Sequence, residues 1–326
     1  MRSMARERTT QEKLRFRRWL RRALLRSALV VALITVAVFF IIRLVPGDPA
    51  VMVLGEHAAS DAIEALRDRL GLNLSPGRQF ARFLQNVFLR GDTGESVKYG
   101  VSSRALVFQR APVTLLLAAL STLITLGATL LLAFLAATHR DGLFDQVIRV
   151  APAFTQGMPV FWLGLLLILS FAVRLRWFPV GGLRPGFGGM LHSLVLPAVT
   201  ISFGQIPPLV RSLRERLIEA LDADYVTTLR AARVPMRTIY LRHILRNAFI
   251  PTLMLFSVNL SYLIGGTLVV EQVFAVRGIG HLLFEAISNR DFPLVQAVAL
   301  YCAVFVVIVS FLADLIAHRA DPRTLT

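Results

Sequence analysis

The chain alternates between long apolar blocks and shorter polar stretches. Six blocks of about 18 to 25 residues are nearly free of charge, and each is long enough to cross the ~30 Å hydrocarbon core of a bilayer as a helix. The pattern therefore predicts an all-α, polytopic membrane protein with six transmembrane helices. The predicted spans are Ala23–Ile42, Thr114–Ala137, Val150–Val173, Met190–Val210, Ala248–Val270 and Leu294–Ile316.

Two of these blocks contain residues that interrupt helices. The third has Pro152, Gly157 and Pro159 in its first half, and the fourth contains three prolines, beginning with Pro197. An alternative with five spans, in which the proline-rich fourth block is merged or lost, would place the C-terminus on the opposite side of the membrane.

Composition supports the membrane assignment. The 326 residues are 55% hydrophobic and only 17% charged, whereas soluble domains have roughly 25% charged residues. This balance excludes an ordinary soluble domain, a disordered chain and a disulfide scaffold. The single cysteine, Cys302, lies in an apolar block and is expected to be ordinary packing.

The charge distribution predicts the orientation in a cell inner or plasma membrane. The net charge is +16, and ten of the first 26 residues are basic. By the positive-inside rule, this places residues 1–22 and the basic segment 211–247 in the cytoplasm, together with the C-terminus. Residues 43–111 are then extracytoplasmic, and residues 112–326 form the core with spans two to six. Nucleic-acid binding is not expected, because no reading motif accompanies the charge.

The extracytoplasmic segment is expected to fold. Ser60 and Asp61 predict a helix start and Gly71 a helix stop, and apolar residues at helical spacing predict a second amphipathic helix from Phe80 to Phe88. Two interpretations remain open here: a cap that packs on the ends of the spans, or a docking surface for a partner.

The spans hold almost no ionisable groups near mid-membrane, which disfavours an ion-coupled secondary transporter, although that remains the alternative of a different class. The main polar side chains at depth are Gln205, Asn259 and Tyr262. They are interpreted as helix–helix hydrogen-bonding groups, with pathway lining as a weaker alternative.

No catalytic or metal-binding constellation is found, so the chain is not expected to be an enzyme. It has no H-E-x-x-H helix and no G-x-S-x-G turn. Lys13 and Lys98 are the only lysines, and neither follows a glycine as a nucleotide-binding P-loop requires. Energy for uphill transport must therefore come from another subunit.

The cytoplasmic segment between the fourth and fifth spans carries the functional inference. Asp222 and Asp224 are expected to cap a short helix over Tyr225–Ala232, and a third helix is expected over Met236–Asn247. A short helix held crosswise between two longer ones would act as a lever for a partner protein. The alternative is a basic juxtamembrane hairpin that only sets orientation.

Residues of this segment resemble the "EAA" loop of the permease subunits of binding-protein-dependent ABC importers, and most closely those of the dipeptide/oligopeptide group. The similarity rests on Asp224-Tyr225-Val226, Arg230-Ala231, Arg242-His243 and Arg246-Asn247-Ala248 with Pro251. Further motifs in family order include Pro46-Gly47-Asp48-Pro49, Gly91-Asp92-Thr93-Gly94, Pro159-Val160-Phe161-Trp162, Glu271 with Phe274 and Gly278-Ile279-Gly280, Asn289-Arg290-Asp291-Phe292-Pro293, and Asp321-Pro322-Arg323.

The resemblance implies a type I ABC importer permease fold and a non-catalytic subunit that translocates di- or oligopeptides. It implies four kinds of partner: a second homologous permease in a heterodimer, two ATP-binding subunits, an extracytoplasmic binding protein and the lipid bilayer. No cofactor is implied in this chain, since ATP and Mg would be bound by the partner subunits. Nickel, glutathione or an oligosaccharide is the alternative substrate within the same family.

The resemblance also implies which residues couple to the ATPase. These are Asp224, Tyr225, Val226, Arg230, Ala231, Ala232 and Arg233. The family usually has glycine where this chain has Arg233. Glycine after a helix commonly supplies a left-handed backbone angle, so Arg233 is expected either to bear some strain or to form a different turn.

Overall fold

The computed structural model describes residues 2–43, 47–55, 57–245, 248, 252, 255–256 and 265–320. Regular structure within these ranges is helical, with an isolated β-bridge between Glu95 and Ser102. The chain divides into two compact units, Met1–Val107 with Glu285–Thr326, and Phe108–Phe284.

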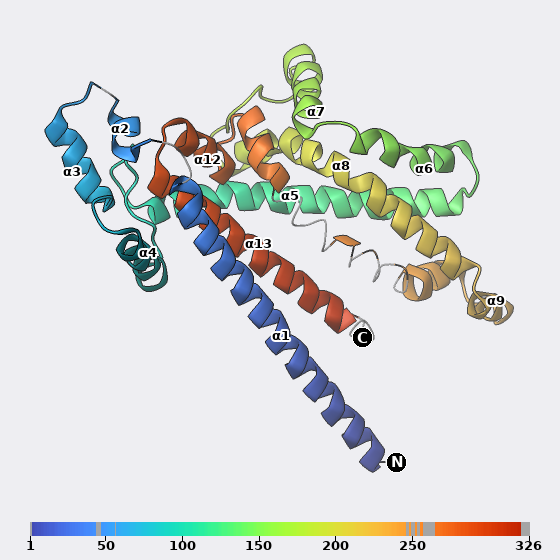
Figure 1. Cartoon of the computed structure of the whole chain (residues 1–326). Coiled ribbons are helices and arrows are strands. Elements are labelled where there is room, and N and C mark those ends of the chain that lie inside the picture. Colours follow the sequence, from blue (N-terminus) through green and yellow to red (C-terminus); the bar gives the residue numbers. More distant parts are fainter. Residues whose placement is uncertain are drawn as a thin grey trace. The chain divides into compact units, whose positions relative to one another are not determined.

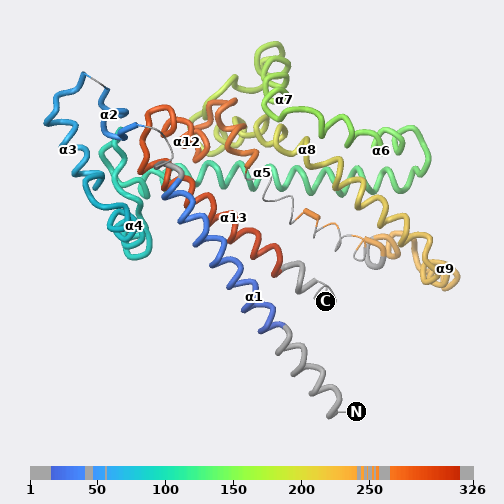
Figure 2. Tube along the Cα trace, viewed as in Figure 1, coloured from blue at the N-terminus to red at the C-terminus, as the bar shows by residue number. Residues whose placement is uncertain are grey.

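Two long helices, α1 and α13, run side by side as the frame of the first unit (Figure 1). Trp19 of α1 stacks on Phe311 of α13 with ring centroids 6.5 Å apart. Short helices lie at the C-terminal end of α1 (Figure 2). The elements of this unit are α1 (Arg2–Arg43), α2 (Pro49–Leu54), α3 (Ser60–Leu70), α4 (Pro76–Gln85), the π-helical η1 (Asn86–Arg90) and α13 (Phe292–Ala320).

The short helices α3 and α4 form a cap on the end of α1. The predicted limits of α3 are confirmed, since it starts at Ser60 and ends before Gly71, which has the left-handed φ of 70°. Phe80 and Phe83 of α4 contact Phe39 of α1, with ring centroids 4.9 and 5.4 Å apart. Phe80 and Phe83 of the amphipathic stripe predicted from sequence thus pack on the end of the first predicted span, whereas Phe88 is 68% exposed.

The second unit is a helical bundle in which α6 lies along α8 (Figure 1). Small residues allow α5 and α8 to approach closely: Ser202 of α8 donates a hydrogen bond to the carbonyl of Ser121 on α5 at 2.9 Å. The described helices are α5 (Ser103–Thr138, which begins in the first unit), α6 (Leu143–Gln156), α7 (Val160–Leu167) with η2 (Ile168–Arg174), α8 (Phe187–Leu221), α9 (Asp224–Ala231), α10 (Met236–Thr238) with η3 (Ile239–Ile244), residues 265–273, and α12 (Ile279–Ser288, which ends in the first unit).

Four helices of the described chain are long and apolar enough to cross a membrane, and they contain predicted spans one, two, four and six. The proline-rich fourth block is one continuous helix of 35 residues, α8. The third predicted span is divided: α6 and the α7–η2 pair meet at a bend of 108°. Pro159 is the N-cap of the second of these helices and lacks the N–H that would continue the first.

Most of the fifth predicted span lies outside the described residues. The six-span count and the cytoplasmic location of both termini therefore stay predictions.

Candidate functional site

The short helix predicted in the basic segment 211–247 is present as α9, which follows α8 after a two-residue turn. Of the seven residues expected to contact a partner, six are exposed: Asp224, Tyr225, Arg230, Ala231, Ala232 and Arg233. Tyr225 has 38% of its surface exposed. The helix therefore presents a continuous accessible surface over a full two turns.

Val226 is the exception, with only 1% of its surface exposed. It belongs to an apolar cluster that includes Leu213 and Leu217 of α8 and Ile239 and Ile244 of η3. Burial of one valine contributes roughly 1.5–3 kcal/mol. Val226 thus anchors α9 to the helices before and after it, with Leu229 partly buried against the same cluster.

The prediction that Asp222 and Asp224 cap this helix is wrong. The N-cap residue is Ala223, and no side chain caps the helix N-terminus. Asp224 lies inside the first turn, where its charge is favourable to the helix dipole. Asp222 instead ends α8, and its Oδ2 accepts a hydrogen bond from Arg140 Nη1 at 3.0 Å.

Arg233 adopts the left-handed angle that the family glycine would supply, with φ of 59°. Its N–H donates to the carbonyl of Arg230 at 2.9 Å, and the N–H of Val234 donates to the carbonyl of Leu229 at 3.1 Å. This pair of bonds is a Schellman ending. Arg233 therefore forms the turn that glycine would form, although a residue with a Cβ atom is sterically less favourable than glycine at this positive φ.

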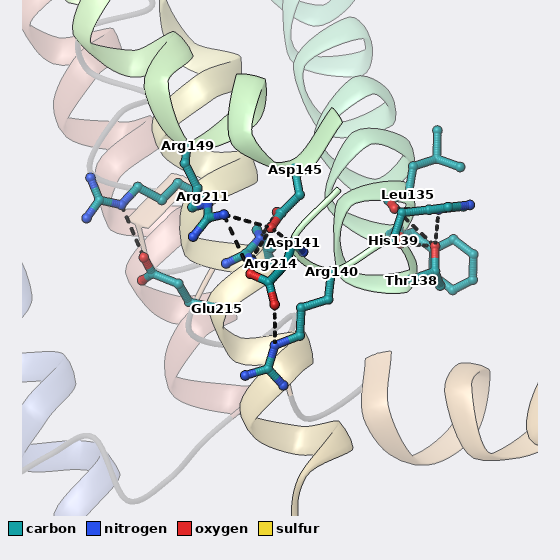
Figure 3. Close-up of polar contacts among 11 residues, drawn as sticks. Leu135, Thr138, His139, Arg140, Asp141, Asp145, Arg149, Arg211, Arg214 and Glu215 are labelled. Carbon is teal, nitrogen blue, oxygen red and sulfur yellow. Dashed lines mark hydrogen bonds and ion pairs between the residues drawn. The ribbon is translucent and has the colours of Figure 1, made fainter. Parts of the chain in front are cut away.

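A buried ion pair joins α6 to the part of α8 that precedes α9. Figure 3 shows Arg214 of α8 and Arg149 of α6 directed at Asp145 of α6. Arg214 Nη2 lies 2.6 Å from Asp145 Oδ2, and its Nε donates to Asp145 Oδ1. Asp145 Oδ2 also accepts from the backbone N–H of Asp141 at 3.0 Å and lies 3.5 Å from Arg149 Nη2.

Together with the Arg140–Asp222 pair, this ion pair joins the α5–α6 turn to the part of α8 that leads into α9. No sequence pattern indicated this ion pair. Asp145 and Arg214 are 69 positions apart, and neither belongs to a short motif. The available signal was an acidic residue inside an otherwise apolar helical face, because buried carboxylates require a charged or hydrogen-bonding partner.

The three polar residues considered for a transport pathway remain a prediction. Gln205 is half-buried on α8, and Asn259 and Tyr262 lie outside the described residues. Within the described ranges, no group of three His, Cys, Asp or Glu side chains is placed to hold a metal ion.

A second buried carboxylate, Glu271, was noted in sequence only as part of a motif. Its Oε1 accepts from Thr114 Oγ1 of α5 at 2.5 Å, and its Oε2 accepts from the backbone N–H of Gly280 at 2.6 Å. The hydroxyl of Thr114 also accepts from the N–H of Ile279 at 2.8 Å. Glu271 and Thr114 thus satisfy the free N–H groups at the start of α12.

Comparison with known proteins places these features in a family. Residues 129–326 match the family described as binding-protein-dependent transport system inner membrane component, and residues 15–118 match its N-terminal counterpart.

Three relatives illustrate the range of named substrates. A putative peptide transport system permease protein of Brucella suis is 36% identical, over 90% of this chain and 94% of that one. The oligopeptide transport system permease protein AppB of Bacillus subtilis is 32% identical over 89% and 93%. The nickel import system permease protein NikB of Staphylococcus aureus is 30% identical over 92% and 89%.

Among solved structures, an inward-facing MetNI methionine ABC transporter contains a similar chain. It aligns with 66% of this chain and 96% of its own length, with a TM-score of 0.53 and 17% sequence identity. The two chains therefore share a similar fold.

Proposed function

The chain belongs to the family of binding-protein-dependent transport system inner membrane components, and from that membership we propose that it is the membrane-spanning subunit of an ATP-driven importer of short peptides. Several relatives of high similarity are named as peptide, oligopeptide or di/tripeptide permeases. Nickel is the second candidate substrate, because a nickel permease of Staphylococcus aureus is 30% identical over most of this chain.

The proposed mechanism rests on the exposure of helix α9. It is too short to fold alone, so its conformation depends on Val226 and on the helices that flank it. A partner that binds its exposed surface would therefore move α8 and η3 with it. This is the property expected of a coupling helix.

In this mechanism two ATP-binding subunits receive α9 and supply the energy. Closure of these subunits around ATP would move α9, and the bundle would follow by switching access to the pathway. A nucleotide shifts such an equilibrium only as far as its affinity differs between the two states. ATP and Mg would bind to the partner subunits, an extracytoplasmic binding protein would deliver the peptide, and a second, distinct permease would complete the pathway.

The test uses the full complex in proteoliposomes, with ATP hydrolysis and uptake of a labelled peptide measured together. Tyr225→Ala and Ala231→Glu alter the exposed surface of α9 and are expected to leave membrane insertion and ATP hydrolysis in place while uptake is lost. Glu219→Gln is the matched control, because Glu219 is exposed on α8 and lies outside α9. Unchanged uptake in both α9 variants would contradict the coupling role.

The substrate is tested separately by competition. Unlabelled dipeptides and oligopeptides are expected to reduce uptake of the labelled peptide, whereas nickel ions are expected to have no effect. Nickel uptake that peptides do not compete with would favour the second candidate. Uptake driven by an ion gradient with this chain alone would instead indicate a secondary transporter.

A further inference from the structure

The first unit contains a cavity of about 400 Å³ at the C-terminal end of α1. Its walls come from α3, α4, η1 and the first turn of α13, all of which belong to this unit. Phe39 and Phe83 contribute an apolar floor and are almost completely buried. The cavity therefore combines apolar and polar lining residues.

Positive charge dominates the polar wall. Arg69, Arg82 and Arg90 line the cavity, against the single carboxylate of Glu95. Arg69 forms an ion pair with Glu95. Within the described chain, the guanidinium groups of Arg82 and Arg90 have no ion-pair or hydrogen-bond partner. The cavity thus carries two uncompensated positive charges.

The guanidinium group of Arg82 lies beside the glycine that ends α3. Its Nη1 lies 3.1 Å from the position that a Cβ atom on Gly71 would occupy. Gly71 ends α3, and Gln79 fixes the following turn by donating to the carbonyls of Leu72 and Leu74 at 3.1 and 2.8 Å. A larger residue at position 71 would displace the guanidinium group.

The cavity also lies at a defined depth. Phe39 is three residues before the end of the first predicted span, and Gln296 is two residues into the sixth. Gln296 Nε2 donates to the carbonyl of Val38 at 3.4 Å, which places the two span ends at the same level. By the predicted limits of the first and sixth spans, this is the level at which hydrocarbon gives way to lipid headgroups.

We propose that this cavity binds the phosphate headgroup of an anionic phospholipid from the leaflet around the C-terminal end of α1, with Arg82 and Arg90 as its ligands. A guanidinium group can donate two parallel hydrogen bonds to the oxygens of one phosphate. Phe40 is 51% exposed on the adjacent α1 surface. Its ring would contact the acyl chains of the bound lipid as they extend toward the bilayer. The bound lipid would tie the cap to the membrane surface, independently of the substrate that is transported.

The test is lipid retention by the purified full-length chain in its complex, measured by native mass spectrometry. The probe is phosphatidylglycerol, with phosphatidylcholine as the zwitterionic comparison. We expect phosphatidylglycerol to be retained preferentially and its affinity to fall about fivefold for each of Arg82→Gln and Arg90→Gln, as expected for the loss of one basic residue near an anionic headgroup.

Arg78→Gln is the matched control, because Arg78 is exposed on α4 but does not line the cavity. Arg82→Lys keeps the charge but loses the paired hydrogen bonds, so it is expected to retain more lipid than Arg82→Gln and less than the wild type, which separates loss of binding from loss of folding. Equal retention in wild type and both glutamine variants would overturn the proposal. Binding of inorganic phosphate or of a peptide carboxylate at these arginines, without preferential retention of phosphatidylglycerol, would overturn it as well.

Discussion

Arg214 of α8 binds both carboxylate oxygens of Asp145 on α6, with Nη2 lying 2.6 Å from Oδ2. The Asp145 side chain is fully buried, and that of Arg214 is 10% exposed. Breaking a buried pair by removing one partner leaves an uncompensated charge, which is far more unfavourable than losing an exposed pair. This pair therefore fixes α6 against the helix that leads to α9.

Replacement of Asp145 by asparagine is expected to lower the free energy of unfolding by roughly 3–5 kcal/mol, because Arg214 is left buried without an anion. Denaturant unfolding of the purified protein measures this change. Glu215→Gln is the control, since Glu215 forms an exposed i,i+4 pair with Arg211 and its loss should change stability by less than about 0.5 kcal/mol.

The joint replacement of Asp145 by leucine and Arg214 by methionine is expected to recover much of that loss, because a packed apolar pair needs no charge compensation. A single Asp145→Asn variant as stable as the wild type would show that the ion pair does not brace the bundle.

Replacement of Arg233 by glycine is expected to stabilise the end of α9. Arg233 has a φ of 59°, and a left-handed angle is unfavourable by roughly 1–2 kcal/mol for a residue with a side chain. Glycine loses part of this gain to its greater freedom in the unfolded chain, so a net stabilisation of about 0.5–1 kcal/mol is expected. Denaturant unfolding monitored near α9 measures the change.

Ala232→Gly is the opposite control for this turn. Ala232 has a φ of −72°, where glycine brings no steric relief and adds only unfolded-state entropy. It is expected to destabilise by about 0.5–1 kcal/mol. If both glycine variants change stability in the same direction, the strain at Arg233 is not the cause.

Local signals in the sequence predicted much of the fold correctly. Helix periodicity and the glycine stop gave the limits of α3, and the helix expected over Tyr225–Ala232 lies within one residue of α9 at each end, although its expected caps were wrong. Both depend on interactions between residues close in sequence. The left-handed angle at Arg233 was likewise one of two outcomes expected from local turn chemistry.

Long-range polar pairs could not be found in the same way. Asp145 and Arg214 come from different helices, and their pairing depends on how α6 turns against α8. The 108° bend after α6 was indicated only as a helix interruption, since Gly157 and Pro159 mark a break without fixing its angle. Packing, rather than local propensity, decides both features.

Replacement of Gly280 by alanine is expected to disrupt the junction between Glu271 and α12. A Cβ atom at this position would lie 2.4 Å from Leu268 Cα and 2.7 Å from the Leu268 carbonyl oxygen, and backbone atoms cannot move aside as a flexible side chain would. The expected loss is about 1–3 kcal/mol, typical of overpacking.

Gly127→Ala is the matched control, since Gly127 lies within α5 and an added Cβ would meet nothing within 4 Å. This substitution is expected to be neutral or slightly stabilising, because alanine favours the helix. Thermal unfolding of the two variants in the same detergent makes the comparison. Equal melting temperatures would contradict the close contact at Gly280.

Asp48 makes the stability of the α2–α3 segment depend on pH. Partial burial acts to raise the pKa of this carboxyl, but hydrogen bonds from Arg67 and from the N–H of Ala50 outweigh it and lower the pKa below its usual value. Because the pKa is lower in the folded state, the ionised Asp48 carboxylate stabilises the fold at pH values above the unfolded pKa of about 3.9. This stabilisation is lost as the pH falls through the folded-state pKa. Stability of this segment is therefore expected to decrease on acidification below about pH 4, and Asp48→Asn is expected to remove that part of the decrease. Thermal unfolding of both proteins over a series of acidic pH values measures it, and parallel pH profiles for wild type and variant would show that Asp48 is not responsible.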